Sequence, residues 1–261
     1  MGEILIGTSG FYYDDWKGVF YPDDLPSREY LSYYSGRFKI LELNFSYYKI
    51  PDARQSRQMI EKSEGRVQFT IKAFRQLTHE ISERSVSEVL PLFLKGIAPF
   101  AEERRLGAVL LQFPQSFHYT VENRFYLKSL IEALANLPVA VEFRQKEWLR
   151  DSVYKALEDV KAAFVCVDEP SLSSLMPPAA IATSDIGYIR FHGRNKKDWY
   201  GTDSRTRYDY LYSEDELKEW VPKIRTLADS TKKMFVFFNN HAKAQAVNNA
   251  GMLRNLLSIE Q

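Results

Sequence analysis

Eight short apolar runs divide this chain, and nearly every one of them ends in a polar or charged residue. The runs are Ile4–Gly7, Ile40–Asn44, Gln68–Lys72, Ala108–Phe113, Val139–Arg144, Ala163–Asp168, Tyr188–His192 and Phe235–Asn239. Most of the segments between them have helical patterns, and repeated strand–helix units require a parallel sheet. Eight such units predict an α/β fold, a closed (β/α)8 TIM barrel whose active site lies at the carboxyl ends of the strands.

Length and composition agree with one barrel. The chain has 261 residues, close to the roughly 250 typical of this fold, and contains no linker or low-complexity tract, so we predict a single domain over residues 1–261. With 35 basic and 34 acidic residues, any anion site must come from local charge. The first residues do not resemble a secretion signal, and no apolar stretch approaches the ~18 residues of a membrane span. We therefore expect a cytoplasmic protein without a membrane partner.

Two segments depart from the regular strand–helix pattern. The sequence SLSSLMPPAAIATSD, after the sixth run, leaves little room for a helix and predicts a degenerate sixth helix. Pro91 and Pro99 predict that the helix expected over 85–105 is kinked or broken. Ser213, followed three residues later by Glu216, has the pattern of a capping box at the start of a helix over 213–230.

Alternation along the runs predicts which side chains point into the barrel, because successive strand residues face opposite sides. In the second run, for example, Glu42 opposes Leu41 and Leu43. We expect one cavity at the strand ends to be lined by Glu42, Lys72, Glu142, Arg144, Asp168, Arg190, His192 and Asn239. Buried polar groups must pair or meet water. The alternative is therefore an internal salt-bridge network, such as Glu42–Arg144 or Glu142–Arg190, that only fills the barrel.

The candidate catalytic residues are the carboxylates Glu42, Glu142 and Asp168, together with His192. Carboxylates at strand ends are suited to general acid/base catalysis, or to holding a divalent cation. Four histidines are too few for a multi-zinc site. The sequence therefore requires no cofactor, and a single divalent cation remains compatible with it.

The candidate substrate-binding residues are mostly cationic, polar or aromatic side chains near the same strand ends. They are Lys72, His79, Gln112, Arg144, Arg190, Arg194, Asn239, His241, Tyr47 and Trp16. The loop over 193–212 adds Lys196, Lys197, Arg205 and Arg207 for phosphate, and Trp199 and Tyr200 for stacking on a base or sugar. The alternative for this loop is a solvated flap with ordinary surface charge.

The strand ends also carry a set of phrases that together resemble one known family. In order these are GTSGFYYDDW, LELNFSYYKIP, TIKA, LLQFPQSF, VEFRQKEW, VDEP, YIRFHGR and VFFNNH. They are similar to a TIM-barrel family catalogued as "domain of unknown function 72", and the similarity runs over essentially the whole chain. The resemblance implies the barrel fold and leaves the activity open. A looser likeness to endonuclease IV and sugar isomerases is an analogy of fold alone.

We therefore expect a TIM-barrel enzyme, with carboxylate- or metal-assisted hydrolysis as the first reaction to test. The expected partner is a phosphate-bearing small molecule or a nucleic acid, with nucleic acid or a nucleotide favoured. One alternative is a non-catalytic barrel that binds nucleic acid or a metabolite. Another is an enzyme like the sugar isomerases.

Overall fold

Eight parallel strands close into a barrel in the order in which they occur along the chain, as the sequence predicts. The computed structural model describes residues 1–134, 136–201 and 204–259. The strands are β1 (Glu3–Ser9), β2 (Ile40–Leu43), β3 (Gln68–Lys72), β4 (Leu106–Gln112), β5 (Val139–Glu142), β6 (Ala163–Asp168), β7 (Ile186–Phe191) and β8 (Lys233–Phe238). Several strands end one or two residues earlier than predicted, which is within the usual uncertainty of strand boundaries.

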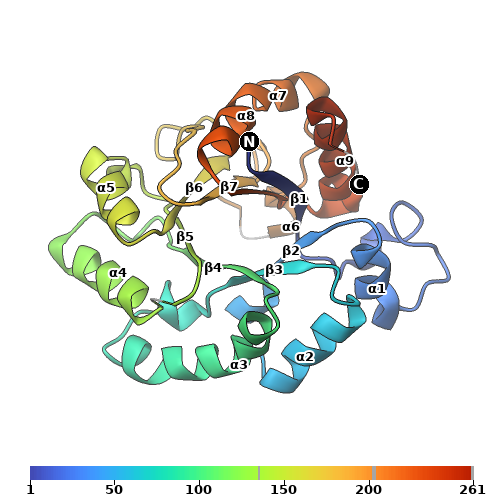
Figure 1. Cartoon of the computed structure of the whole chain (residues 1–261). Helices are drawn as coiled ribbons and strands as arrows, with labels where there is room; N and C mark the ends of the chain where they lie inside the picture. The colour runs from blue at the N-terminus through green and yellow to red at the C-terminus, as the bar shows by residue number, and fades with distance from the viewer. Residues whose placement is uncertain (135, 202–203, 260–261) are drawn as a thin grey trace.

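Helices surround the barrel and cover the outer face of its strands (Figure 1). The described helices are α1 (Tyr30–Ser35), α2 (Ala53–Lys62), α3 (Leu90–Glu102), α4 (Val121–Ala133), α5 (Asp151–Asp159), α6 (Ser204–Arg207), α7 (Glu214–Lys218), α8 (Val221–Ser230) and α9 (Gln245–Leu257). No helix lies between β6 and β7, all of whose connecting residues are described, so the degenerate sixth helix is confirmed.

Proline shapes two of these helices. A π-helical turn over Ser85–Val89 leads into α3, which has Pro91 in its first turn. The expected helix is therefore irregular before Pro91, and it continues past Pro99 to Glu102. The single helix expected over 213–230 is wrong, because α7 and α8 are separate helices. Pro222 lies in the first turn of α8, where its missing N–H costs no hydrogen bond, so the proline begins a new helix there. The capping box of Ser213 and Glu216 at the start of α7 is confirmed.

Strand register decides which side chains face the barrel interior. Paired residues of parallel strands project to the same side, and Arg190 of β7 is paired with Val167 of β6 and Phe237 of β8. These positions point inward, as does Glu142, which hydrogen-bonds Arg190 across the barrel. Asp168 is paired instead with Phe191, whose ring packs against Trp220 at the start of α8. Asp168 therefore faces the helices.

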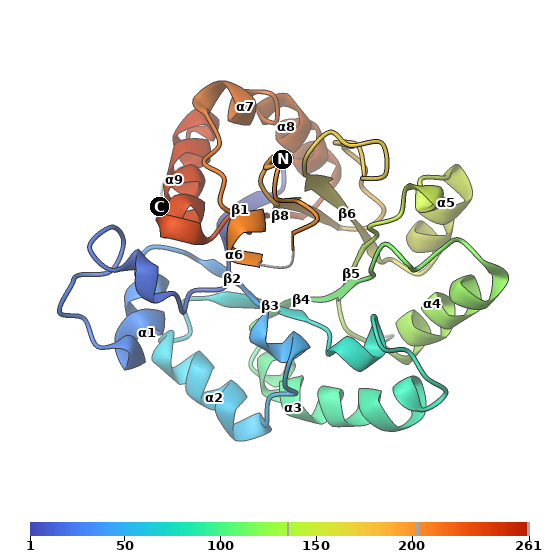
Figure 2. The ribbon, with the colours of Figure 1, turned by 180° about the vertical axis from the view of Figure 1, so that it is seen from behind.

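The carboxyl ends of the strands open on the side seen in Figure 2, where α6 lies in front of the barrel. The loop that carries α6 therefore reaches the end of the barrel where the polar strand ends lie. Within the described ranges, no helix combines the length and the apolar character needed to cross a membrane.

Candidate functional site

The buried side chain of Arg190 spans the inside of the barrel and joins two carboxylates from strands on different sides of it. Its Nη2 donates to Glu42 Oε1 of β2 at 2.6 Å, and its Nη1 donates to Glu142 Oε2 of β5 at 2.7 Å. Glu42 and Glu142 are each 0% exposed, and Arg190 is 2% exposed. The second oxygen of Glu42 accepts a hydrogen bond from Tyr188 at 2.7 Å. Both carboxylates are therefore engaged by donors inside the barrel.

Arg144 lies beside this bridge and is more exposed than Arg190. Its Nε lies 2.6 Å from Glu142 Oε1, and its Nη1 donates to Glu169 Oε2 at 2.9 Å. Burial alone would raise the pKa of Glu142, but Arg144 and Arg190 hold that pKa well below its usual range. Glu142 is therefore a carboxylate at neutral pH and is weakened as a base.

His192 supports Arg144 from the neighbouring strand β7. Arg144 Nη2 lies 3.0 Å from His192 Nε2, and a guanidinium can only donate, so Nε2 is the acceptor. Burial, and then the charge of Arg144, lower the pKa of His192 to about 3, so the ring is neutral at pH 7. Its other ring nitrogen, Nδ1, lies 3.1 Å from the amide nitrogen Nδ2 of Asn239. His192 and Asn239 thus orient Arg144.

Glu169 belongs to this site and was missed by the sequence analysis. It is 6% exposed, accepts from Arg144, and also accepts the backbone N–H of Met176 at 2.8 Å. Burial raises its pKa above the ordinary glutamate value. The phrase VDEP alone did not reveal this, because only the pairing of β6 with β7 shows that Val167 points inward, which makes Glu169, rather than Asp168, the next inward residue.

Lys72 ends β3 at the same opening and lies against an aromatic ring. Its Nζ is 4.4 Å from the centre of the Tyr47 ring, and its side chain is half-buried. Within the described part of the chain, no hydrogen bond or ion pair engages this amine. Burial, and then the positive charge of Arg190, lower the pKa of Lys72 to about 7. Lys72 therefore loses its proton more readily than an exposed lysine does.

His79 also contacts Tyr47, at 4.8 Å between ring centres. Its Nδ1 lies 2.9 Å from the hydroxyl of Thr78. Burial, and then the charge of Lys72, lower the pKa of His79 to about 4, so it is neutral at pH 7. The structure thus brings Lys72, Tyr47 and His79 together at one part of the opening.

Three other predicted binding residues are less available to a ligand. Gln112 is 7% exposed, and its Nε2 donates to the backbone oxygen of Phe113. His241 stacks on Tyr13 at 4.5 Å with nearly parallel rings. Trp16 is 0% exposed and donates from Nε1 to the backbone oxygen of His241 at 2.7 Å. Trp16 is therefore a core residue that holds His241 and is not itself exposed to a ligand, contrary to its expected role as a substrate-binding residue.

Asp168 and Arg194 lie apart from the inner network, contrary to the expected placement of Asp168 in the cavity. Arg194 donates to both oxygens of Asp168, at 2.9 and 2.7 Å. Trp220 Nε1 and the Tyr212 hydroxyl also donate to this carboxylate, at 2.6 and 2.7 Å. Four donors satisfy Asp168 on the helix side of β6. This pair fixes the loop after β7 against α8.

The loop after β7 presents fewer free groups than its composition predicts. Lys196 and Lys197 are exposed, whereas Trp199 is 4% exposed and is not available for stacking on a base. Arg207 donates to the backbone oxygen of Gly201, and the side chain of Arg205 lies outside the described residues. Tyr208, which follows α6, lies 6.1 Å from the His192 ring between centres and faces the opening.

A divalent cation finds no evident set of ligands in the described residues. They contain no group of three or more His, Cys, Asp or Glu side chains arranged to hold a metal ion. Glu42 and Glu142 do not converge on a shared space, because the guanidinium of Arg190 lies between them.

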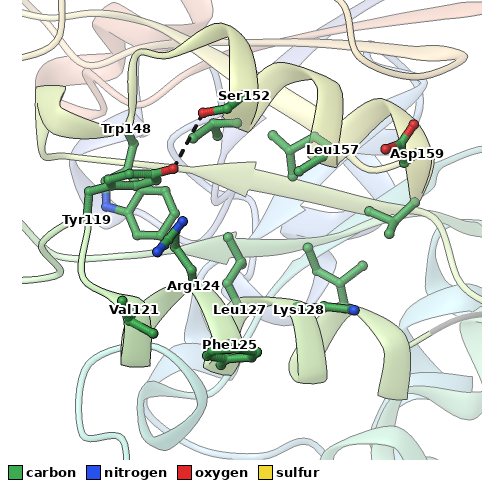
Figure 3. A pocket seen from close by; sticks show the side chains of 14 residues that line it. Tyr119, Val121, Arg124, Phe125, Leu127, Lys128, Trp148, Ser152, Leu157 and Asp159 are labelled. Atoms are coloured by element: carbon green, nitrogen blue, oxygen red, sulfur yellow. Dashed lines mark hydrogen bonds between the residues drawn. The ribbon is translucent and has the colours of Figure 1, made fainter.

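A separate apolar groove of about 580 Å³ lies on the outside of the barrel, between α4 and α5 (Figure 3). Phe125 and Val121 of α4 are 67% and 51% exposed there. Arg124, Lys128 and Asp159 supply charge at its edges. This groove has no connection with the polar network described above.

Comparison with known proteins agrees with this architecture. A family model described as "Protein of unknown function DUF72" matches residues 5–261. The UPF0759 protein YunF of Bacillus subtilis (strain 168) is 32% identical, over 98% of this chain and 95% of its own length. A DUF72 family protein from Thermotoga maritima MSB8 is 40% identical with a TM-score of 0.90, over 98% of this chain and 99% of the other.

A second solved structure, a DUF72 family protein from Enterococcus faecalis V583, is more distant. It is 24% identical with a TM-score of 0.86, over 99% of this chain and 96% of the other, and shows the shared fold. The match of the family model covers almost the whole chain, and the barrel topology agrees with it. The chain therefore belongs to the DUF72 family of TIM-barrel proteins.

Proposed function

We propose that this protein is an enzyme that binds a small phosphate-bearing substrate at the carboxyl ends of its strands, between Lys72 and Arg144. One observation carries the proposal: these two cations keep donors for a ligand, whereas Arg190 below them is engaged by carboxylates. Arg144 has five N–H donors, of which three face Glu142, Glu169 and His192, so that two remain. The Arg144 side chain is 14% exposed, compared with 2% for Arg190.

Charge balance also favours an anion. The three inner cations Lys72, Arg144 and Arg190 face three carboxylates, and burial raises the pKa of one of these, Glu169. A phosphate dianion bound near Lys72 would favour the ammonium form of that side chain. Binding above pH 7 is therefore expected to take up a proton.

The same contacts change the roles proposed for the acidic residues. Glu42 and Glu142 support the arginines, because each carboxylate accepts a hydrogen bond from Arg190 and neither is exposed. Hydrolysis by this carboxylate pair therefore has little support from the geometry. Lys72 is the better candidate for the group that contacts substrate.

A nucleic acid is the weaker candidate partner. Arg194 is engaged by Asp168, and Trp199 is buried, so two of the residues that favoured nucleic acid are committed to the fold. The exposed Lys196 and Lys197 remain. They provide a direct way to separate the two proposals, because a nucleic acid would need them and a small phosphate at the barrel opening would not.

Calorimetric titration of inorganic phosphate at pH 8 tests the proposal. Wild type should bind, Arg144→Met should weaken binding by about tenfold or more, and Lys196→Ala should have no effect. The titration is then repeated with sulfate, which does not itself titrate near this pH, in buffers of different ionisation enthalpy. The dependence of the binding heat on the buffer gives the number of protons taken up. Uptake that disappears in Lys72→Met supports the proposed site. Equal binding by wild type and Arg144→Met, or weakening by Lys196→Ala alone, would contradict it.

A further inference from the structure

We propose that Lys72 is a nucleophile that forms an imine with the carbonyl carbon of a phosphorylated aldehyde or ketone. This inference rests on the proposed phosphate site and adds to it a reaction class and a catalytic residue. It places the carbonyl carbon at Lys72 Nζ and the phosphate against Arg144. The proton uptake expected for free phosphate, which contacts both cations, therefore does not apply to this substrate.

The position of Lys72 favours such a role. It is the last residue of β3 and lies at the carboxyl ends of the strands, where TIM-barrel enzymes carry out their chemistry. Ser46 donates to the backbone oxygen of Lys72 at 2.6 Å, which fixes the main chain that carries the amine. The side chain is half-buried, so it is reachable from solvent and still partly desolvated.

The surroundings of the amine leave its nitrogen available. The nearby carboxylates Glu42 and Glu142 accept from Arg190 rather than from Lys72. Nζ of Lys72 lies over the face of the Tyr47 ring, 4.4 Å from its centre. In the neutral amine an N–H can point at the ring face, and this contact leaves the nitrogen lone pair free.

The electrostatic environment supports the geometry. A lysine beside other cations in a desolvated site loses its proton more readily, which is the usual way in which imine-forming lysines are activated. The pKa of Lys72 is lowered to about 7 by burial and then by Arg190. At neutral pH, Lys72 thus has a far larger fraction of free amine than an exposed lysine does.

The chemical step is balanced without an additional reactant. The neutral amine of Lys72 forms a bond to the carbonyl carbon, which gives a carbinolamine. The carbonyl oxygen then leaves as water, with one proton from the Lys72 nitrogen and one from solvent. The product is a protonated imine, which withdraws electrons from the adjacent carbon and makes its C–H or C–C bond easier to break. The neutral His79 imidazole, which shares the Tyr47 contact with Lys72, is available to accept a proton there.

Reductive trapping tests the inference in the wild-type protein. Glyceraldehyde 3-phosphate and unphosphorylated glyceraldehyde are each incubated with the protein at pH 7 in the presence of sodium cyanoborohydride, and peptide mass spectrometry measures modification at each lysine. Lys72 should be modified at least about tenfold faster than the exposed Lys196. The phosphorylated aldehyde should react faster at Lys72 than the unphosphorylated one. Lys72→Met should lose this adduct and retain the slow modification of Lys196.

The outcomes separate the imine from the phosphate site. If both aldehydes modify Lys72 quickly and equally, the result supports Lys72 as the nucleophile and contradicts the phosphate site. Modification of Lys72 no faster than that of Lys196, with either aldehyde, would overturn the imine. The phosphate site would in that case still be judged by the calorimetric titration, which does not depend on any covalent step.

Discussion

Replacing Glu142 by Gln tests whether the inner carboxylates hold the barrel together. Glu142 accepts from Arg190 at 2.7 Å, lies 2.6 Å from Arg144 Nε, and is 0% exposed. Each pair of charges about 4 Å apart is worth ~4 kcal/mol at an effective dielectric constant near 20. Arg190 keeps Glu42 and Arg144 keeps Glu169, so part of this interaction survives. We expect Glu142→Gln to lower the free energy of unfolding by about 3–5 kcal/mol.

Urea unfolding followed by tryptophan fluorescence measures this loss. The matched control is Glu132→Gln, which removes an exposed partner of Lys128 and should change stability by less than ~1 kcal/mol. The pKa of Glu142 is depressed on folding, so its stabilising effect is present above the ordinary value of 4.5 and is lost as pH falls through the folded pKa. The difference between wild type and Glu142→Gln should therefore shrink in acid. A loss below about 1 kcal/mol at pH 7 would refute the structural role of Glu142.

Three further substitutions probe other parts of the molecule. Lys72→Met should stabilise the protein by about 1–2 kcal/mol at pH 7. Wild-type stability should rise between pH 7 and 10.5, because the unfolded chain binds more protons there than the folded protein, and Lys72→Met should abolish this rise. Urea melts across pH measure both effects. Asp168→Asn should cost about 3 kcal/mol in the same melts while phosphate affinity stays within twofold, since its four donors lie outside the inner network. Ser213→Ala should lower the free energy of unfolding by about 1 kcal/mol, because it removes the capping box.

The sequence alone was sufficient to predict the barrel. Eight apolar runs with the right spacing correspond to the eight strands, because a strand buried on both faces must be apolar over most of its length. The degenerate sixth helix followed from the short segment after the sixth run, which leaves little room for a helix. The break between α7 and α8 was missed, although Pro222 marked it, because a proline within the first turn of a helix and one inside a helix look alike in sequence.

Alternation identified the inner polar side chains but not their pairing. The sequence left open an internal network such as Glu42–Arg144 or Glu142–Arg190. In the structure the second of these pairs forms, whereas Glu42 pairs with Arg190. Which cation meets which carboxylate depends on side-chain reach across the barrel, which strand periodicity does not encode.

Alternation did not predict the inward face of a strand that has no polar residue before its end. Strand β6 is apolar on both faces until Asp168, so nothing in its own sequence distinguished the inner face from the outer. Its pairing with β7 settles the question and places Asp168 among the donors from α8 and the loop after β7. Glu169 was overlooked for the same reason. The low pKa of Lys72 could not be predicted from the sequence either, since it arises from burial in the folded barrel and then from arginines that are distant along the chain.

A crystal structure of the protein with bound tungstate, a heavy analogue of phosphate, tests the location of the substrate site most directly. The anomalous signal should lie at the carboxyl ends of the strands, within contact of Lys72 Nζ and the Arg144 guanidinium. It should be absent from crystals of Arg144→Met grown in the same way. Tungstate bound instead at Lys196 and Lys197, with the space between Lys72 and Arg144 empty, would contradict the proposed function.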